Sequence, residues 1–424
     1  MIRLIEAKGY RCLKYVRQSL GPFHVLVGPN ASGKTTFLDV IAFLGQLVSD
    51  GLDAAIEERT QNFDDLVWQR AGDGFELAIE LAIPQEYQGK LGHKDFDVVR
   101  YELSIGWDGS ERVTIRDENV LLKTQTEDGG AYAQPDLFPR NGDLPRSIIM
   151  GTDVPRTQPV VSKDPSNNVC FYAEVQPKQG NLEGYREIGF YTFGPRRTGL
   201  GNLPEDETRF PISTWLKRFL SGAVQRFVLN SLLIRKPSPP GKGRLLLNDG
   251  SNLPWVIDHL NKTSPDRLKD WVKHLQTALP DLEQIETIER PEDKHRYLML
   301  GYKGGLKVPS WMASDGTLRL LALTLPAYIP ELKGIYLIEE PENGIHPLAV
   351  QTMFQSLSSV YDAQVLLATH SPLILGLTEP DKVLCFSKTP EGATDIVLGS
   401  EHPALKEWRG ETDLGTLFAA GVLG

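Results

Sequence analysis

Glycine, lysine and threonine residues near the start of the chain have a spacing that suits phosphate binding. Residues 28–35 read GPNASGKT, which fits the pattern G-x-x-x-x-G-K-[ST] at every defined position. The apolar run FHVLV at 23–27 precedes them, and an apolar-periodic helix is expected over about 34–48. In such a loop successive N–H groups point at phosphate oxygens, and the helix N-terminus adds its positive dipole end. The sequence therefore predicts a nucleotide phosphate site.

The residues of this phosphate loop (28–35) have separate expected roles. Lys34 can reach the β- and γ-phosphates, and the Thr35 hydroxyl can ligate Mg²⁺. ATP and Mg²⁺ are therefore the expected cofactors. The residues expected to bind the nucleotide here are Asn30, Ala31, Ser32, Gly33, Lys34, Thr35 and Thr36.

Two adjacent glutamates, Glu339 and Glu340, follow a second apolar run, IYLI at 335–338. A buried strand that ends in carboxylates places them at the carboxyl edge of a parallel sheet, where ligands bind. We expect Glu339 to hold Mg²⁺, directly or through water, and Glu340 to orient or deprotonate the attacking water. Glu339 stands where aspartate is usual and is longer by one methylene. By itself the segment also fits a solvated acidic turn, but the phosphate loop favours the catalytic interpretation.

Two further segments carry candidate phosphate contacts. His370 ends the next apolar run, VLLAT at 365–369, and can hydrogen-bond the γ-phosphate. Ser314 and Gly316 open a helix in the segment SDGTLR. That segment is either a capped helix or a second anion site, where the Ser314 hydroxyl, the Gly316 N–H and the helix dipole bind a γ-phosphate.

The elements that must position these residues give an α/β fold with a mostly parallel core sheet, an antiparallel β subdomain and a helical insertion. The expected strands include 75–83, 98–106, 112–116, 169–175, 188–193, 283–289 and 296–302. One long helix is expected over 213–234, two helices near 253–279 and another from about 316. Residues 125–165 are rich in Pro, Gly, Asp and Thr, and indicate a loop. The expected units are an N-terminal lobe (1–120), an inserted region (121–280) and a C-terminal lobe (281–424).

The composition excludes several classes of protein. The chain has 424 residues, of which 41% are hydrophobic and 24% charged, as in ordinary globular proteins. Its net charge of −10 argues against a general nucleic-acid coat protein. Three scattered cysteines argue against a disulfide framework or zinc cluster, and no apolar run reaches the ~18 residues of a membrane span. We therefore expect a cytoplasmic protein that does not associate with membranes.

The motifs, in this order, resemble the ABC-class ATPase heads of the OLD (overcoming lysogenization defect) family and the ATPase subunits of the antiviral systems Septu, PARIS and Gabija. The matching segments are Gly28–Thr36, Ser314–Arg319, Glu339–Pro347 and His370–Pro372. The resemblance is weak over residues 120–250. It implies an ABC-type P-loop ATPase head. It also implies that the signature of one subunit (here Ser314–Arg319) caps the ATP of another, so that two heads sandwich two nucleotides.

The resemblance also implies a glutamine near the metal. Gln61 and Gln69 both lie in the right interval, before the first strand of the β meander. Gln61 is the expected Mg²⁺ ligand, although each of the two also fits a solvated loop. Arg11, in the bend of the first hairpin, is expected to contact the nucleotide.

Related heads differ in what they carry beyond the ATPase core. The sequence lacks the heptads of chromosome-maintenance heads, and the segment after His370 is too short for the Toprim domain of OLD nucleases. The resemblance therefore implies a self-associating ATPase head that controls a separate effector, such as a nuclease or toxin, in anti-phage defence. The alternatives are a nucleotide-gated scaffold with negligible turnover and a RecF-like DNA repair ATPase.

Residues 208–248 form a basic stretch without any acidic residue. It contains Arg209, Lys217, Arg218, Arg226, Arg235, Lys236, Lys242 and Arg244, with Phe210, Trp215, Phe219 and Phe227 between them. A basic groove with aromatic residues suits a nucleic-acid backbone. An acidic partner, a sister subunit, or an amphipathic helix whose basic side chains cover its own core would fit equally well.

Overall fold

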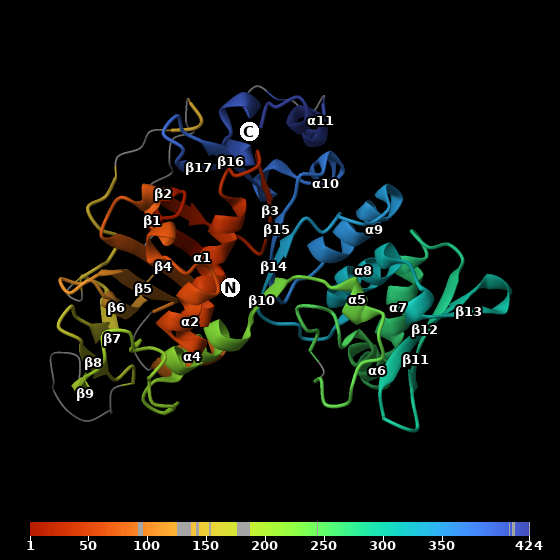
Figure 1. The fold of residues 1–424 in the computed structure, drawn as a ribbon, viewed down its shortest axis with the longest axis horizontal. Coiled ribbons are helices and arrows are strands. Elements are labelled where there is room, and N and C mark those ends of the chain that lie inside the picture. The colour runs from red at the N-terminus through yellow and green to blue at the C-terminus, as the bar shows by residue number, and fades with distance from the viewer. Residues whose placement is uncertain are drawn as a thin grey trace.

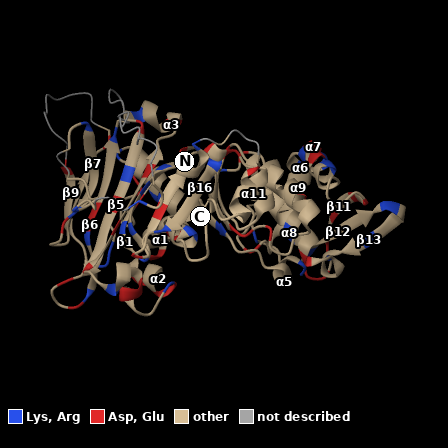
Figure 2. Cartoon of the chain, turned by 90° about the horizontal axis from the view of Figure 1, so that it is seen from above, with Lys and Arg blue, Asp and Glu red and all other residues tan. Residues whose placement is uncertain are grey.

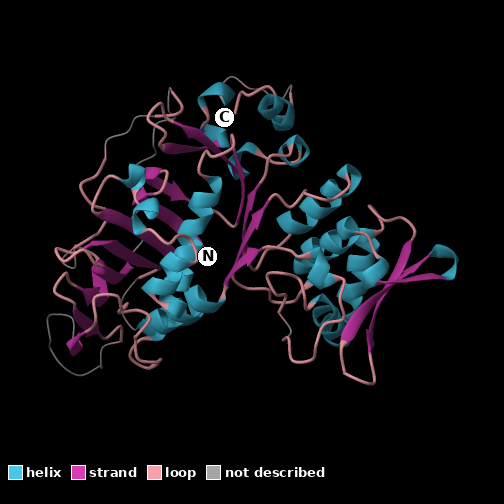
Figure 3. Cartoon of the chain, in the orientation of Figure 1, coloured by secondary structure: helices cyan, strands magenta, loops and turns pink. Residues whose placement is uncertain are grey.

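The computed structural model describes residues 1–91, 96–124, 137–140, 144–151, 154–175, 187–243, 245–406, 408 and 412–423. Its strands form three sheets of eight, six and three strands. Figures 1 and 3 show the antiparallel eight-stranded sheet on one side of the molecule, the six-stranded central sheet in the middle and a helical lobe on the other side. None of the described helices is long and apolar enough to cross a membrane.

The central sheet carries the segments that the sequence singled out. Its strands, in spatial order, are β10 (Val224–Phe227), β14 (Ile335–Glu339), β15 (Gln364–Ala368), β3 (Phe23–Val27), β16 (Val383–Lys388) and β17 (Thr394–Leu398). Neighbouring strands run parallel from β10 to β16, and only β17 runs antiparallel to its neighbour. The carboxyl ends of β3, β14 and β15 therefore meet at one edge.

Helix α1 (Lys34–Asp50) covers one face of this sheet, and the helical lobe covers the other. Successive residues of a strand point to opposite faces, so each central strand contributes side chains to two hydrophobic cores. Leu26 and Leu337 belong to the core that surrounds α1, whereas Val25 and Ile338 belong to the core of the helical lobe. This double burial explains why the strands read as continuous apolar runs instead of alternating ones.

The antiparallel sheet packs on the opposite side of α1. Its order is β2 (Leu13–Ser19), β1 (Ile2–Tyr10), β4 (Gly74–Ala82), β5 (Val98–Trp107), β6 (Val113–Lys123), β7 (Thr157–Lys163), β8 (Asn168–Tyr172) and β9 (Glu187–Thr192). The short helices α2 (Leu52–Glu57) and α3 (Gln85–Gln88) and the longer α4 (Pro211–Gly222) lie on this side of the central sheet (Figures 1 and 2).

The helical lobe and the C-terminal region complete the fold. They contain α5 (Ser231–Ile234), α6 (Leu253–Thr263), α7 (Pro265–Leu275), α8 (Asp315–Thr324), α9 (Pro347–Ser358), α10 (Pro372–Gly376) and α11 (Leu414–Ala419). A small antiparallel sheet, β11 (Leu282–Glu289), β12 (Arg296–Tyr302) and β13 (Leu306–Pro309), extends from this lobe. The mixed α/β class expected from the sequence is confirmed.

Two local predictions were wrong. The single helix expected over 213–234 is interrupted: α4 ends at Gly222, and β10 pairs with β14 before α5 begins. Pairing with the central sheet outweighs the helical periodicity, and Asn230 starts α5 by accepting a hydrogen bond from the Leu232 N–H. The predicted loop 125–165 contains β7, which pairs with β6. Much of the remainder, including 125–136, lies outside the described residues.

Gln364, at the start of β15, links the central sheet to the antiparallel one. Its side chain is fully buried. The amide oxygen accepts a hydrogen bond from the Ile2 N–H at 2.9 Å, and the amide nitrogen donates to the carbonyls of Ile2 and Gly21 at 2.8 and 2.7 Å. One side chain therefore forms hydrogen bonds with three backbone groups, two of them at Ile2 and one at Gly21.

We expect Gln364→Leu to lower the free energy of unfolding by at least about 2 kcal/mol, because a buried polar group without a partner costs about 1–3 kcal/mol. Urea denaturation followed by circular dichroism measures this loss. Gln351→Leu, on the exposed side of α9, is the matched control and should change stability little. Equal stability of the two variants would contradict the role of Gln364.

Candidate nucleotide site

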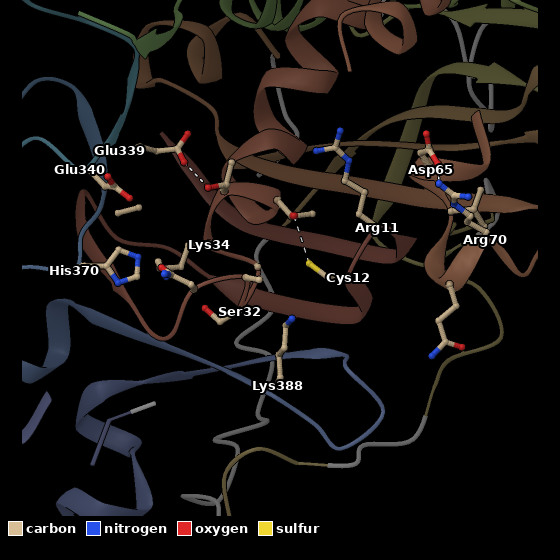
Figure 4. A pocket seen from close by; sticks show the side chains of 18 residues that line it. Arg11, Cys12, Ser32, Lys34, Asp65, Arg70, Glu339, Glu340, His370 and Lys388 are labelled. Carbon is tan, nitrogen blue, oxygen red and sulfur yellow. Dashed lines mark hydrogen bonds and ion pairs between the residues drawn. The ribbon is translucent and has the colours of Figure 1, made fainter. Parts of the chain in front are cut away.

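A cavity of about 620 Å³ opens where the central strands end (Figure 4). It is lined by Arg11, Cys12, Asn30, Ala31, Ser32, Gly33, Lys34, Thr35, Thr36, Asp65, Val67, Gln69, Arg70, Glu339, Glu340, Ala368, His370 and Lys388. The residues that follow β3, β14 and β15 in the sequence are thus brought together, as the edge of a parallel sheet requires. The volume lies in the usual range for small-molecule sites.

Two glycines let the phosphate loop lie directly against the β16–β17 hairpin. Gly28 has φ +147° and Gly33 has φ +103°, which are conformations that other residues rarely adopt. A Cβ on Gly28 would come within 2.2 Å of the Phe386 carbonyl oxygen, and one on Gly33 within 2.2 Å of Thr394 Oγ1. Thr394 also donates a hydrogen bond to the Ser32 carbonyl at 2.9 Å. The hairpin therefore sets the shape of the loop.

Lys34 lies under its own loop and faces the cavity. Its Nζ donates hydrogen bonds to the carbonyls of Gly28 at 2.8 Å and Pro29 at 2.9 Å. Burial lowers the pKa of Lys34 to about 8, although the charges of Glu340 and Glu339 oppose this shift. The ammonium group is thus close to neutralisation and would gain from an anionic partner.

The two residues expected to hold Mg²⁺ contact each other. Thr35 Oγ1 donates a hydrogen bond to Glu339 Oε2, and Glu339 Oε1 accepts one from Arg226 at 2.7 Å. The Thr35 hydroxyl oxygen and the Glu339 carboxylate oxygen thus lie next to each other, and Mg²⁺ prefers such oxygen ligands. Among the described residues the buried Ser32 hydroxyl finds no partner, which fits a site built for a further polar group. The donor set therefore suits a magnesium nucleotide.

Glu340 and His370 lie beside Lys34 in Figure 4. Glu340 has φ +46°, so the backbone turns out of the strand, and its N–H donates to the Ala368 carbonyl at 2.8 Å. This turn lets two consecutive glutamates face one cavity, although residues of a strand normally alternate. The His370 N–H donates to Glu342 Oε1 at 3.2 Å. Burial and the nearby Lys34 charge lower the pKa of His370, although the charges of Glu340 and Glu342 oppose the shift, and this favours the neutral ring.

This arrangement can support phosphoryl transfer to water. Mg²⁺, when bound, supplies positive charge to the phosphate oxygens. Lys34 can bind those oxygens, the Glu340 carboxylate can accept a proton from a water in the cavity, and the neutral His370 ring can donate a hydrogen bond. The three groups come from segments that follow different central strands: Lys34 comes after β3, Glu340 after β14 and His370 after β15.

Arg11 lines the cavity as expected, but Gln61 does not. Arg11 sits in the bend between β1 and β2 with φ +49°, and its guanidinium pairs with Asp39 Oδ2 at 3.3 Å. Gln61 is exposed and is not among the residues that line the cavity, whereas Gln69 is. Gln69 Nε2 donates to the Glu391 carbonyl at 3.3 Å. The geometry therefore favours Gln69, and a metal role for Gln61 stays a prediction without support from its position.

Ser314 and Gly316 lie outside this cavity. Ser314 caps α8, because its Oγ accepts a hydrogen bond from the Thr317 N–H at 3.1 Å. Gly316 is needed for close packing, since a Cβ there would come within 2.6 Å of the Gly344 carbonyl oxygen. Neither residue is among those that line the cavity. The structure thus does not bring the signature to the phosphate loop of the same chain.

Several residues that line the cavity escaped the sequence analysis. They are Cys12, Asp65, Val67, Arg70, Ala368 and Lys388. Lys388 had a usable signal, because it ends an apolar run and so lies at the same sheet edge as Glu339. Asp65 and Arg70 had no such signal, because they lie in an irregular segment without a recognisable sequence pattern. The structure joins them in an ion pair of 2.5 Å.

Four of the eight basic residues in the stretch 208–248 pair with acidic residues from outside it. Arg209 pairs with Asp206, Arg218 with Glu207, Arg226 with Glu339 and Arg235 with Asp315. Phe210 and Phe227 are buried, and Arg244 lies outside the described residues. Figure 2 shows acidic and basic residues interspersed over the chain. Nucleic-acid binding by this stretch stays a prediction.

The fold is that of an ABC-type P-loop ATPase head. A solved SMC head bound to the C-winged helix domain of ScpA has a TM-score of 0.52 and 15% identity, and the alignment covers 93% of this chain and 97% of that one. At this identity the likeness concerns the fold alone. It confirms the predicted ABC-type architecture.

A family model described as "AAA domain, putative AbiEii toxin, Type IV TA system" matches residues 23–150 and 218–376, and the chain belongs to this family. It is similar to a probable ATPase of retron Vc95 from Vibrio cholerae, with 22% identity over 90% of this chain and 72% of the relative. It is also similar to an OLD nuclease from Thermus scotoductus, with 21% identity over 99% and 68%. The chain is therefore an ATPase-type head related to OLD and retron ATPases, as the resemblance predicted.

The lowered pKa of Lys34 predicts that nucleotide affinity depends on pH. Phosphates favour the charged amine, so affinity should be highest well below pH 8 and should fall above it, by up to about tenfold per pH unit. Binding near pH 8 should also take up protons. Calorimetry in two buffers of different ionisation enthalpy measures this uptake. Constant affinity between about pH 7 and pH 9 would contradict the assignment.

Proposed function

We propose that the chain binds ATP with Mg²⁺ and hydrolyses it. The observation that carries this proposal is that two pairs of residues line one cavity. Lys34 and Thr35 follow β3, Glu339 ends β14, and Glu340 follows it. Lys34 binds the β- and γ-phosphates, Thr35 and Glu339 hold Mg²⁺, and Glu340 is the general base. His370 contacts the γ-phosphate, and Arg11 contacts the nucleotide from the hairpin bend.

We propose further that two heads form a dimer around ATP. The support is the position of Ser314 and Gly316, which lie away from the cavity of their own chain at the N-terminus of α8. A helix N-terminus offers N–H groups and a dipole to a phosphate, and here only the nucleotide of a second head can use them. ADP lacks the γ-phosphate and should hold the two heads together poorly.

We also propose that this cytoplasmic head controls a separate effector in defence against phage. The support is the kind of protein it resembles: one relative is a retron ATPase and another an OLD nuclease. A nuclease or toxin is the chemistry that such an effector would supply. Co-purification of the chain with such a partner supports the proposal, and a dimer that reproducibly purifies alone from its native source argues against it.

Glu340→Gln should leave ATP binding intact and slow hydrolysis by at least about a hundredfold, because a general base contributes about 10²–10⁴ in rate. Phosphate release under saturating ATP measures the effect. The exposed Glu331→Gln is the matched control and should hydrolyse ATP like the wild type. Normal turnover in Glu340→Gln would place the base elsewhere. Undetectable turnover in the wild-type dimer would instead favour the nucleotide-gated scaffold.

Ser314→Arg should abolish hydrolysis while leaving ATP binding nearly unchanged, because the arginine fills the anion site that serves the other head. Mixing this variant with Lys34→Ala should restore part of the activity, since one of the two mixed sites joins an intact phosphate loop to an intact signature. Subunit exchange is checked by fluorescence energy transfer between labelled heads. An inactive mixture, despite exchange, would count against action across the dimer or against independent firing of the two sites.

A further inference from the structure

Arg226 reaches the candidate metal site from the edge strand of the central sheet. In the register of β10 and β14, Arg226 lies beside Leu337, whose side chain belongs to the core around α1. Glu339 is two residues further along β14 and so lies on the same face. The guanidinium therefore crosses diagonally on the face that α1 and Thr35 cover, and it contacts Glu339 Oε1 at 2.7 Å.

The backbone that carries Arg226 is held in place on both sides. The neighbouring Phe227 points to the opposite face, where it is buried against Tyr336 with ring centroids 5.3 Å apart. Gly334 permits close contact between the strands, because a Cβ there would come within 2.4 Å of the Ala223 carbonyl oxygen. The Ile335 N–H donates to that same carbonyl at 2.8 Å. The starting point of the Arg226 side chain is thus well defined.

The two oxygens of Glu339 have different partners. Arg226 takes Oε1, and the Thr35 hydroxyl takes Oε2. The guanidinium therefore does not contact Oε2, the oxygen that lies beside Thr35, where the metal is expected. Glutamate has one more rotatable bond than the usual aspartate, so its carboxylate needs an external partner to keep one orientation. A charge-assisted hydrogen bond from arginine supplies such a partner.

We propose that Arg226 is a positioning residue that orients Glu339 toward Mg²⁺. This inference rests on the proposed function of the site. Arg226 is not among the residues that line the cavity, so we expect it to act through the Glu339 carboxylate and not on the nucleotide directly. Arg226 belongs to the basic stretch 208–248, for which the sequence left nucleic-acid binding open. The proposal gives this residue a role at the metal site.

An ordinary surface ion pair is the competing explanation. The Arg226 side chain is 41% exposed, and exposed pairs often contribute little to stability. The two explanations differ in what depends on Arg226. A surface pair affects at most stability, whereas a partner that orients a metal ligand typically changes metal affinity by about 10–100-fold.

The test is the Mg²⁺ dependence of nucleotide binding. A slowly hydrolysed fluorescent ATP analogue is titrated with MgCl₂, and the concentration for half of the Mg²⁺-dependent signal is determined. Arg226→Met should raise this concentration about tenfold or more, while binding of the analogue in EDTA stays as in the wild type. Arg226→Lys, which keeps the charge but not the planar fork, should fall between the two.

Arg218→Met is the matched control, because Arg218 belongs to the same stretch but pairs with Glu207 outside the cavity. It should leave the Mg²⁺ dependence unchanged. A shift below twofold in Arg226→Met, a lower Mg²⁺ requirement, or an equal loss of binding in EDTA would each overturn the positioning role. Absence of any Mg²⁺-dependent binding in the wild type would instead contradict the proposed function itself.

Discussion

The candidate site depends on one close approach, between the phosphate loop and the hairpin of β16 and β17. Gly28 and Gly33 permit it, since any side chain at either position would overlap Phe386 or Thr394. Thr394 then holds the loop by its hydrogen bond to Ser32. Because the loop begins α1, this contact also sets where Lys34 and Thr35 enter the cavity. A phosphate loop of this shape needs the C-terminal hairpin as much as its own glycines.

The order of the central strands converts this local contact into a composite site. Only one strand, β15, lies between β3 and β14. The phosphate loop and the two glutamates are therefore close across the sheet, although about 300 residues separate them in the sequence. His370 follows β15, the strand between them, and lines the same cavity. Opposite faces of the same strands pack against two different cores, so these strands are covered on both faces up to the edge where the site lies.

The sequence was most informative where a residue type has one dominant physical use. Glycines before Lys34 and paired acids after an apolar run predicted the phosphate loop, the metal pair and the parallel sheet between them. It was misleading where pairing with a distant strand decides the outcome. Residues 213–234 have helical periodicity, yet β10 forms because β14 offers an open edge. The choice between Gln61 and Gln69 depended on the path of an irregular segment, in which Gln69 has φ +53°.

The contact between Arg226 and Glu339 shows why charge along the sequence is a poor guide to charge in space. The stretch 208–248 has no acid of its own, yet the acids that neutralise four of its arginines come from segments outside it. Arg226 pairs with Glu339 at the candidate metal site, Arg235 pairs with Asp315 within the signature, and the other two arginines pair with Asp206 and Glu207. Two arginines of the stretch 208–248 therefore form ion pairs that connect it to the candidate metal site and to the signature.

The most direct test of the account is equilibrium binding of ATP to Lys34→Ala. The account places the Lys34 ammonium at the centre of the phosphate site, so removing it should abolish measurable binding of a fluorescent ATP analogue. Lys262→Ala, on the exposed side of α6, is the matched control and should bind like the wild type. Affinity in Lys34→Ala equal to that of the wild type would show that the nucleotide is not held by this loop.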